Sequence, residues 1–289
     1  MIRINASQKK KLAAVSSAFR SDGAAVFSAV FLAIIIIISL FAPLFPLDPD
    51  KTDIANMLAS PSLQHWFGTD DLGRDYFARI VYGGRISLLV GVLAMLMSVF
   101  LGVLAGTVSG YFGGVVDEVL MRIVDVIQSI PWLVLVTVVT IFFKKGLGSI
   151  IVVIGFFSWM EIARLVRAEI LSAKEREFVL YAEFSGVPRG RIIFEHLIPA
   201  VFPTIITAAT TNIANAVMTE SALSFLGIGI QEPLSSWGKL LQNAQSNLQG
   251  AVYMALIPGL LIMCTIFAFN KAGNLLRMYA DPRIMEGGV

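Results

Sequence analysis

Glu220 stands in a segment of the chain that is otherwise uncharged and long enough to cross a lipid bilayer. An acidic side chain at such a depth is costly, so it either serves a function or is held by hydrogen bonds. A functional carboxylate would line a gate or path and meet a cationic group there. A structural carboxylate would accept hydrogen bonds from a neighbouring helix or from outer-loop amides. We favour the structural role, because one carboxylate without a second ionisable partner makes a poor proton relay.

Two further residues could shape a path through the membrane. Asp125 lies near the cytoplasmic end of the third apolar segment, and Pro131 follows it on the same segment. Arg122 stands three residues before Asp125 on one helical face, so the two could form an ion pair. Pro131 should kink its helix, because proline lacks the backbone donor that a helix interior needs. We therefore place Asp125 and Pro131 with Glu220 along a predicted path or gate.

Acidic and basic residues also gather in a long loop on the outer side. Three aspartates, two glycines and an arginine fall within residues 68–75, which is typical of tight turns with capped backbone amides. The plainest interpretation is a packed loop held by Asp–Arg pairs. A Ca²⁺ loop would need acids at alternate positions and a glutamate at the twelfth. The other alternative is a docking surface for an external partner, formed by Asp70, Asp71, Arg74, Asp75 and Trp237.

The sequence predicts no catalytic residue, no metal site and no cofactor. His65 and His196 fall in loops on opposite sides of the predicted membrane, and no G-x-S-x-G motif occurs. Lys239 follows Gly238 but precedes leucine, without the spacing of a phosphate-binding loop. We therefore expect no enzyme activity in this chain, and any energy from ATP must come from another subunit. The basic residues are explained by their role in orienting the membrane spans, and no nucleic-acid partner is predicted.

A charged stretch, 174–199, lies between two bilayer-length segments and reads KEREFVLYAEFSGVPRGRIIFEHLIP. It predicts a short amphipathic helix, a left-handed turn at Gly186 and a second helix that begins at Pro188. Ala182 and Gly186 are four residues apart, so we expect a bare patch that another backbone can approach. A hairpin this small cannot bury its own apolar face. It must pack on a partner, on the cytoplasmic ends of the spans or on lipid headgroups. The apolar residues are Phe178, Leu180, Ile192 and Phe194.

The composition predicts an all-α membrane protein, because the mean hydropathy is +0.78 and only 15% of residues are charged. A span needs roughly 20 apolar residues, and five segments are long enough. A sixth, the fourth in the chain, is long enough if its helix continues past Glu161, with Arg164 and Arg167 extending to the interface. The first, 23–47, is too long for a cleaved signal sequence, so we expect it to be retained. The predicted parts are a tail 1–22, that first span, an outer loop 48–84, a five-helix core 85–273 and a tail 274–289. The core spans are about 86–110, 118–143, 147–168, 200–226 and 250–272.

The distribution of Lys and Arg predicts the orientation of these spans. With the N-terminus inside, 15 of the 22 basic residues fall on the cytoplasmic side. Both termini are therefore expected in the cytoplasm.

Several motifs resemble those of binding-protein-dependent ABC importer permeases. In the stretch 174–199, Ala182 and Gly186 followed by Ile198 and Pro199 match A-x-x-x-G … I-P, although the family has Glu-Ala where this chain has Leu-Tyr before Ala182. The outer loop, H-x-x-G-T-D-x-x-G-R-D from His65, is similar to the second permease subunit of the dipeptide/oligopeptide/nickel branch. Further similar motifs are E-x-x-L-S-F-L-G-x-G at 220–229, S-x-W-G at 235–238 and D-P-R at 281–283. The resemblance covers nearly all of the chain beyond residue 25.

The resemblance implies a type I ABC importer permease fold in the bacterial cytoplasmic membrane, forming half of a pathway for peptides. The implied partners are a sister permease, two cytoplasmic ATPase subunits, an external solute-binding protein and the lipid bilayer. It also implies that 174–199 is a coupling element that docks on an ATPase. The residues of that contact would be Glu177, Leu180, Tyr181, Ala182, Glu183, Gly186, Arg189 and Arg191.

Alternative functions remain open from the sequence. The same machine could import nickel, another metal chelate or a glutathione-like peptide. A stand-alone secondary transporter would show inverted repeats and ionisable residues near the midplane. No repeat is visible, and we expect the intramembrane charges to lie near the ends of the spans. An intramembrane hydrolase would need a serine with a histidine, or paired aspartates, inside the bilayer.

Overall fold

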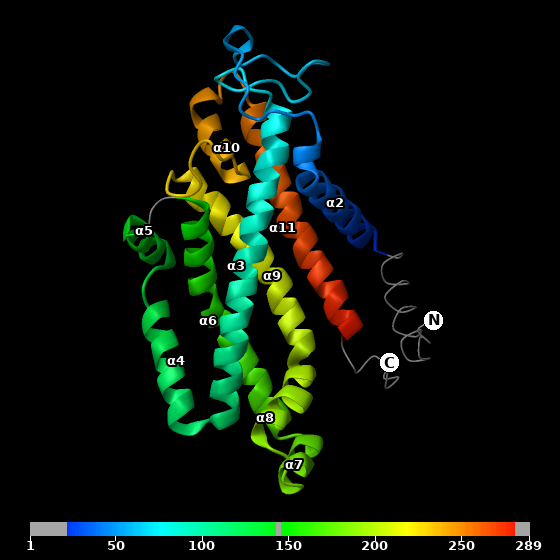
Figure 1. Ribbon diagram of the computed structural model, residues 1–289, viewed down its shortest axis with the longest axis vertical. Coiled ribbons are helices and arrows are strands. Elements are labelled where there is room, and N and C mark those ends of the chain that lie inside the picture. The colour runs from blue at the N-terminus through cyan, green and yellow to red at the C-terminus, as the bar shows by residue number, and fades with distance from the viewer. Residues whose placement is uncertain (1–21, 143–145, 281–289) are drawn as a thin grey trace.

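The computed structural model describes residues 22–142 and 146–280 (Figure 1). Helices dominate this part of the chain, and its only β-type pairing is an isolated bridge between Thr69 and Asp75. The long helices are α2 (Gly23–Leu40), α3 (Tyr76–Phe112), α6 (Leu147–Lys174), α9 (Ile198–Phe225) and α11 (Tyr253–Ala280). The shorter helices are α4 (Gly114–Gln128), α5 (Trp132–Phe142), α7 (Glu177–Phe184), α8 (Arg189–Arg191) and α10 (Trp237–Ala244). Single turns complete the fold: η1 (Ala42–Leu44), η2 (Ile54–Asn56), the π-helical η3 (Ile192–Leu197) and η4 (Gln245–Asn247).

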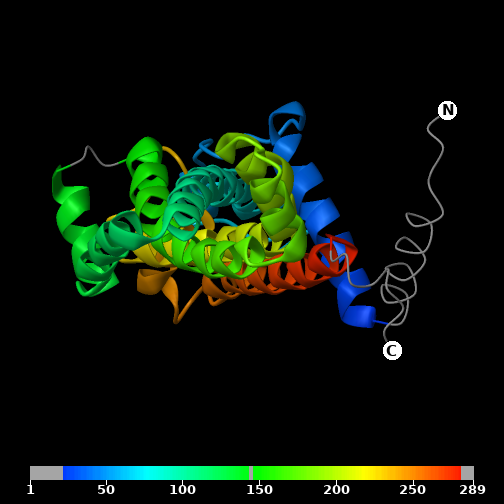
Figure 2. The same ribbon diagram turned by 90° about the horizontal axis from the view of Figure 1, so that it is seen from below.

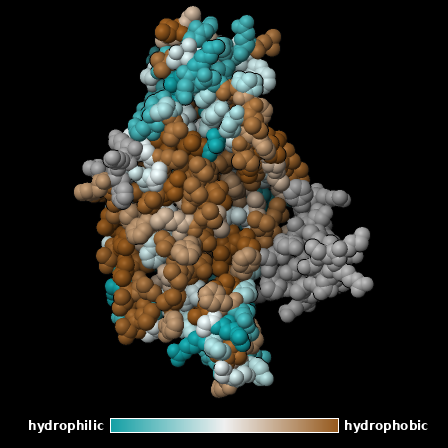
Figure 3. Space-filling model, in the orientation of Figure 1, coloured by the Kyte–Doolittle hydropathy of each residue, from teal (hydrophilic) through white to brown (hydrophobic). Residues whose placement is uncertain are grey.

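In the described residues, five helices are long and apolar enough to cross a membrane, and a bent pair brings the number to six. The pair is α4 and α5, which meet at an angle of 84°. The six spans expected from the sequence therefore correspond to helices, and the kink expected at Pro131 is a complete break. Figure 3 shows a broad hydrophobic band between hydrophilic upper and lower ends, as lipid contact requires.

The helix bounds differ from several predicted spans: α2 ends at Leu40 instead of 47, α11 continues to Ala280 instead of 272, and α3 and α6 are longer than expected. α3 begins at Tyr76, inside the loop expected at 48–84, because the Asp75 carboxylate accepts a hydrogen bond from the backbone N–H of Ala78 at 2.9 Å and caps the helix. Its 37 residues extend about 55 Å at 1.5 Å per residue, well beyond a 30 Å hydrocarbon core. α6 continues to Lys174, so Glu161 lies midway along it. The expectation that charges lie near the ends of the spans is wrong for Glu161.

α3 and α6 pack closely through a row of glycines on α3. Gly102, Gly106 and Gly110 are spaced by four residues and so lie on one face of the helix. A Cβ added at Gly106 would stand 2.5 Å from the carbonyl oxygen of Ala163 on α6. Such small-residue spacing lets membrane helices approach each other closely.

The other long helices complete the bundle on either side of this pair. α9 packs on α3, α6 and α11, while α2 packs on α11 at one edge and α4 with α5 stands at the opposite edge (Figures 1 and 2). Asp22, which caps α2, forms an ion pair with Lys271 of α11. The hydrogen bond from Lys271 lowers the pKa of the Asp22 carboxyl below its usual value.

We predict that Gly106→Ala lowers the stability of the protein by about 1–3 kcal/mol, because the added methyl group meets rigid backbone on α6. The measurement is the thermal unfolding of the detergent-solubilised protein. Gly148→Ala is the matched control, since a Cβ at Gly148 meets nothing within 4 Å. Equal stability of the two variants would contradict the close approach of α3 and α6.

Candidate functional site

The charged stretch forms a hairpin beyond the lower ends of α6 and α9, built from α7, α8 and η3 (Figure 1). α7 ends because Gly186 adopts a φ of +76°, as the sequence predicts. The N–H of Gly186 donates to the carbonyl of Glu183 at 3.0 Å, and that of Val187 donates to the carbonyl of Ala182 at 3.1 Å. These two bonds form a Schellman motif, which fixes the direction of the chain after α7.

The inner face of α7 differs from the expected one. Val179 and Ala182 are buried against Ile170 and Ala173 of α6 and against Ile192 of η3. Ala182 therefore packs inside the hairpin and does not form a bare patch with Gly186. The apolar contacts seat the hairpin on the end of α6 and on the turn that leads into α9.

The exposed side of the hairpin is aromatic. Tyr181 is 76% exposed, Phe184 is 90% exposed and Phe194 is 72% exposed. Leu180, on the same face of α7, is also exposed. Phe184 is absent from the residues predicted for this contact, although its spacing of three and four from Tyr181 and Leu180 places it on their face. The charged members of the predicted set are also exposed: Glu177, Glu183, Arg189 and Arg191.

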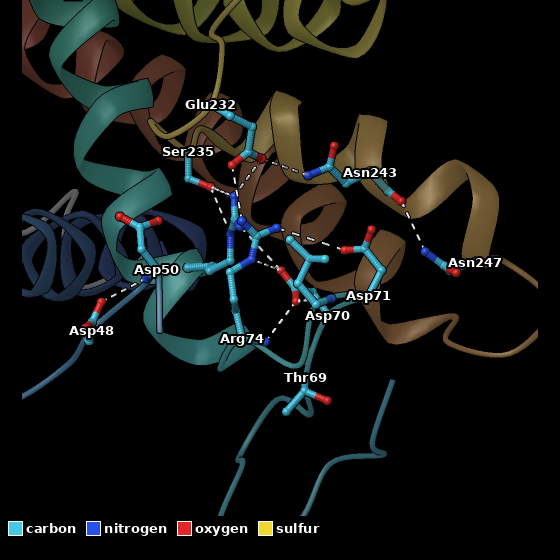
Figure 4. Close-up of polar contacts among 12 residues, drawn as sticks. Asp48, Asp50, Thr69, Asp70, Asp71, Arg74, Glu232, Ser235, Asn243 and Asn247 are labelled. Atoms are coloured by element: carbon cyan, nitrogen blue, oxygen red, sulfur yellow. Dashed lines mark hydrogen bonds and ion pairs between the residues drawn. The ribbon is translucent and has the colours of Figure 1, made fainter. Parts of the chain in front are cut away.

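The acidic and basic residues of the outer loop form a buried network with the segment before α10 (Figure 4). Asp70 accepts a hydrogen bond from the Arg74 guanidinium at 2.6 Å, and Arg74 also donates to Glu232 at 3.2 Å. Arg79 has no exposed surface and donates to Ser235 at 2.8 Å and to Glu232 at 3.2 Å. The network ties residues 70–79 to residues 232–235.

Electrostatics explains how this network tolerates burial. Burial alone would lower the pKa of Arg74, but the hydrogen bond that Arg74 donates to Asp70 and the charges of Asp70 and Glu232 outweigh burial and raise that pKa. Removing one member of such a buried pair leaves an uncompensated charge, which typically costs about 3–5 kcal/mol. Arg79 and Glu232 were not predicted from the sequence, because their partners lie far away in the chain.

Most of the residues proposed for outer docking therefore lie inside the protein. Trp237 is completely buried and its indole N–H donates to the carbonyl of Ile80 at 3.1 Å. Asp70 and Arg74 are also buried. Asp75 caps α3 and accepts from His65 at 2.8 Å, if the imidazole carries its proton on Nδ1. The side chain of Asp71 keeps 47% of its surface exposed.

Glu220 lies on α9 and is completely buried between α3 and the start of α10. Its carboxylate accepts a hydrogen bond from Ser87 of α3 at 2.9 Å and another from Ser224 at 2.7 Å. The Ser87 hydroxyl also accepts a hydrogen bond from the backbone N–H of Trp237 at 3.2 Å, which joins α10 to the same cluster. This geometry favours the structural interpretation of Glu220.

Residues near the break between α4 and α5 line a cavity of about 680 Å³ together with residues of α6 and α9. Pro131 lines the cavity, whereas Glu220 does not. Asp125 forms an ion pair with Arg164, which lines the cavity, and not with Arg122 as expected. Arg167 pairs with Asp117 in the same way. The two arginines of α6 therefore bind aspartates of α4, whereas the sequence suggested that they extend to the membrane interface.

No group of three or more His, Cys, Asp or Glu side chains arranged to hold a metal ion occurs within residues 22–142 and 146–280.

Comparison with known proteins places this geometry in a family. Residues 98–286 match the model of the binding-protein-dependent transport system inner membrane component, and residues 12–61 match that of the N-terminal membrane domain of oligopeptide transport permease C. The first match covers more than half of the chain. The chain belongs to the family of binding-protein-dependent transport system inner membrane components.

Relatives with assigned names include the oligopeptide transport system permease protein OppC of Escherichia coli strain K12. It is 40% identical over 268 residues, which cover 92% of this chain and 89% of the relative. The OppC protein of Bacillus subtilis strain 168 is 36% identical over 269 residues, or 93% of this chain and 88% of the relative. The dipeptide transport system permease protein DppC of the same organism is 38% identical over 262 residues, or 90% and 81%.

A solved structure supports the fold. A chain of the MetNI methionine ABC transporter, determined in inward-facing conformations, aligns with a TM-score of 0.59 and 17% identity. The alignment covers 71% of this chain and 98% of that chain. The fold is therefore that of a type I ABC importer permease, as expected from the sequence.

We predict that Glu220→Gln is tolerated, because the serine hydroxyls can rotate to satisfy an amide. Glu220→Ala leaves these hydroxyls unpaired and should destabilise the outer end by about 1–3 kcal/mol. Thermal unfolding and uptake at matched expression would be measured for both variants. An equally severe loss of uptake in both, at unchanged protein levels, would instead indicate that Glu220 recognises the cargo.

Proposed function

We propose that this chain is one permease subunit of an ATP-driven importer of peptides and forms half of its translocation pathway. The relatives named oligopeptide and dipeptide permeases, each similar over most of its length, support peptides as the cargo. The proposed partners are a sister permease, two cytoplasmic ATPase subunits and an external solute-binding protein. The observation that carries the proposal is the hairpin with its exposed aromatic end.

The hairpin suits a protein partner. Aromatic side chains such as Tyr181, Phe184 and Phe194 contribute most of the binding energy in many protein interfaces, where they fill pockets on the partner. Here they are presented on a short rigid element, with Arg189 and Glu183 exposed beside them. An ATPase subunit with an apolar groove and a charged rim would cover this surface.

The polar face of α4 supports a sister permease. Glu118 and Arg122 are exposed on this helix, and the Asp125–Arg164 pair is about half exposed. Charged side chains in spans face a bundle interior or a water-filled cavity, because contact with hydrocarbon is costly. A second subunit that closes the cavity over α4 and α6 would remove that cost and complete the pathway.

The same geometry gives a mechanism. The apolar contacts of Val179 and Ala182 join the hairpin to α6, and η3 continues directly into α9. A movement of the ATPase subunits would therefore displace α6 and α9 together. These two helices line the cavity, so their displacement would open it alternately to the two sides of the membrane.

We predict that Phe184→Glu combined with Tyr181→Glu reduces ATP hydrolysis stimulated by the binding protein at least about tenfold, because charge replaces the exposed aromatic contact. The permease level in the membrane should not change, since both positions are exposed. Ser172→Glu on α6 is the control, as it adds a charge at an exposed position outside the hairpin. If the binding protein stimulated ATP hydrolysis of the double variant as strongly as that of the wild type, the proposed coupling role would be wrong.

We also predict the orientation of the chain. In a Cys264→Ala background, a cysteine at Leu63, which is 97% exposed, should react in whole cells with a thiol reagent that cannot cross membranes. A cysteine at Glu175 should react only after the membrane is opened, because the distribution of basic residues predicts that this loop faces the cytoplasm. The reverse pattern of labelling would overturn the six-span orientation with cytoplasmic termini.

A further inference from the structure

α9 carries a row of polar side chains along the face that lines two cavities. Thr207, Thr211, Asn215 and Thr219 are spaced by four residues and so follow one face over about 18 Å. They line two cavities that share residues of α6 and α9, the one of about 680 Å³ described above and a smaller one of about 180 Å³. Packing alone does not require polar groups at these positions, and lipid contact disfavours them.

Asn212 provides the sharpest indication of a ligand. It lines both cavities and is only 7% exposed, yet its carboxamide oxygen has no hydrogen-bond partner among residues 22–142 and 146–280. A buried acceptor without a partner costs free energy, so it is normally paired. Asn215, three residues further along α9, lines the same two cavities. Two neighbouring amides of this kind can bind a peptide group, which presents one donor and one acceptor.

One of the two charged residues that line the cavities has no ion-pair partner among the described residues. Glu161 and Arg164 both line the larger cavity from α6. Arg164 is neutralised by Asp125, whereas no side chain in the described part of the chain pairs with Glu161. The Glu161 side chain is exposed in this single chain. Carboxylates within membrane helices face a bundle interior or a water-filled cavity and commonly mark a substrate path. A ligand that pairs with this carboxylate would carry positive charge.

From this arrangement we propose that the shared cavity binds the amino-terminal end of a peptide during its passage. Glu161 accepts hydrogen bonds from the terminal ammonium group, and Asn212 with Asn215 binds the first peptide groups. The proposal rests on the proposed function and adds a binding site within the permease itself, separate from selection by an external binding protein. The volume of about 680 Å³ suits such a ligand, because small-molecule sites commonly measure about 300–1,000 Å³.

The rest of the lining explains how one site could accept different peptides. Trp132, Phe157, Met160 and Met218 supply apolar surface around the polar groups. Methionine side chains adapt to differently shaped neighbours, and such surfaces are typical of binders with many partners. The fixed contacts would then be made to the peptide main chain, and the adaptable contacts to its side chains.

The test compares uptake of tri-alanine by cells in which the complete importer is the only route for this peptide. Glu161→Gln should lower uptake at subsaturating peptide by about tenfold to a hundredfold, because a charge-assisted hydrogen bond is lost. Glu169→Gln, on the same helix but outside both cavities, is the matched control and should transport like the wild type. Asn212→Leu removes an unsatisfied acceptor, so its membrane level should hold or rise while uptake falls.

A binding measurement distinguishes peptide binding by the permease from peptide binding by the external solute-binding protein. The importer without its binding protein, in nanodiscs, should bind radiolabelled tri-alanine more tightly than N-acetyl-tri-alanine, and Glu161→Gln should abolish this preference. Wild-type uptake by both Glu161→Gln and Asn212→Leu would overturn the site, as would equal binding of the two peptides. If the wild-type importer takes up no peptide at all, the proposed function fails together with the site.

Discussion

The close approach of α3 and α6 is the constraint on which the remaining geometry depends. Gly102, Gly106 and Gly110 bring the two backbones together, and no larger residue fits between them without movement of α6. Once α6 is fixed on α3, its arginines can reach the aspartates of α4, and its other face forms one wall of the cavity. Its lower end also carries the hairpin, through the buried contacts of Val179 and Ala182.

Polar side chains divide the molecule into two functional regions. At the outer end they satisfy one another: Asp70, Arg79 and Glu232 form ion pairs, and Glu220 accepts hydrogen bonds from serines. Such fully paired networks stiffen a structure. In the shared cavity the opposite holds: within the described part of the chain, Glu161 has no ion-pair partner and no donor reaches the carboxamide oxygen of Asn212. Groups left unpaired in this way would be available to cargo in the proposed pathway.

Local features of the sequence predicted much of this structure. Hydropathy indicated six spans. Pro131 indicated the break between α4 and α5, and Gly186 indicated the left-handed turn of the hairpin. Each depends on residues close together in the chain. The ion pair of Asp125 with Arg164 and the burial of Ala182 inside the hairpin were not predictable, because both depend on how α6 packs against its neighbours. Helical spacing alone shows which residues share a face, and it does not show which face becomes buried.

The position of α6 and α9 links the two ends of the proposed cycle. Both helices line the cavity where a peptide would bind, and both continue into the hairpin where an ATPase would act. A force on the hairpin therefore reaches Glu161 and Asn212 through unbroken helix and apolar packing. By linkage, a ligand that binds one arrangement of these helices more tightly must also favour that arrangement at the hairpin. Cargo inside the permease would thus influence the ATPase contact directly, in addition to any signal from outside the membrane.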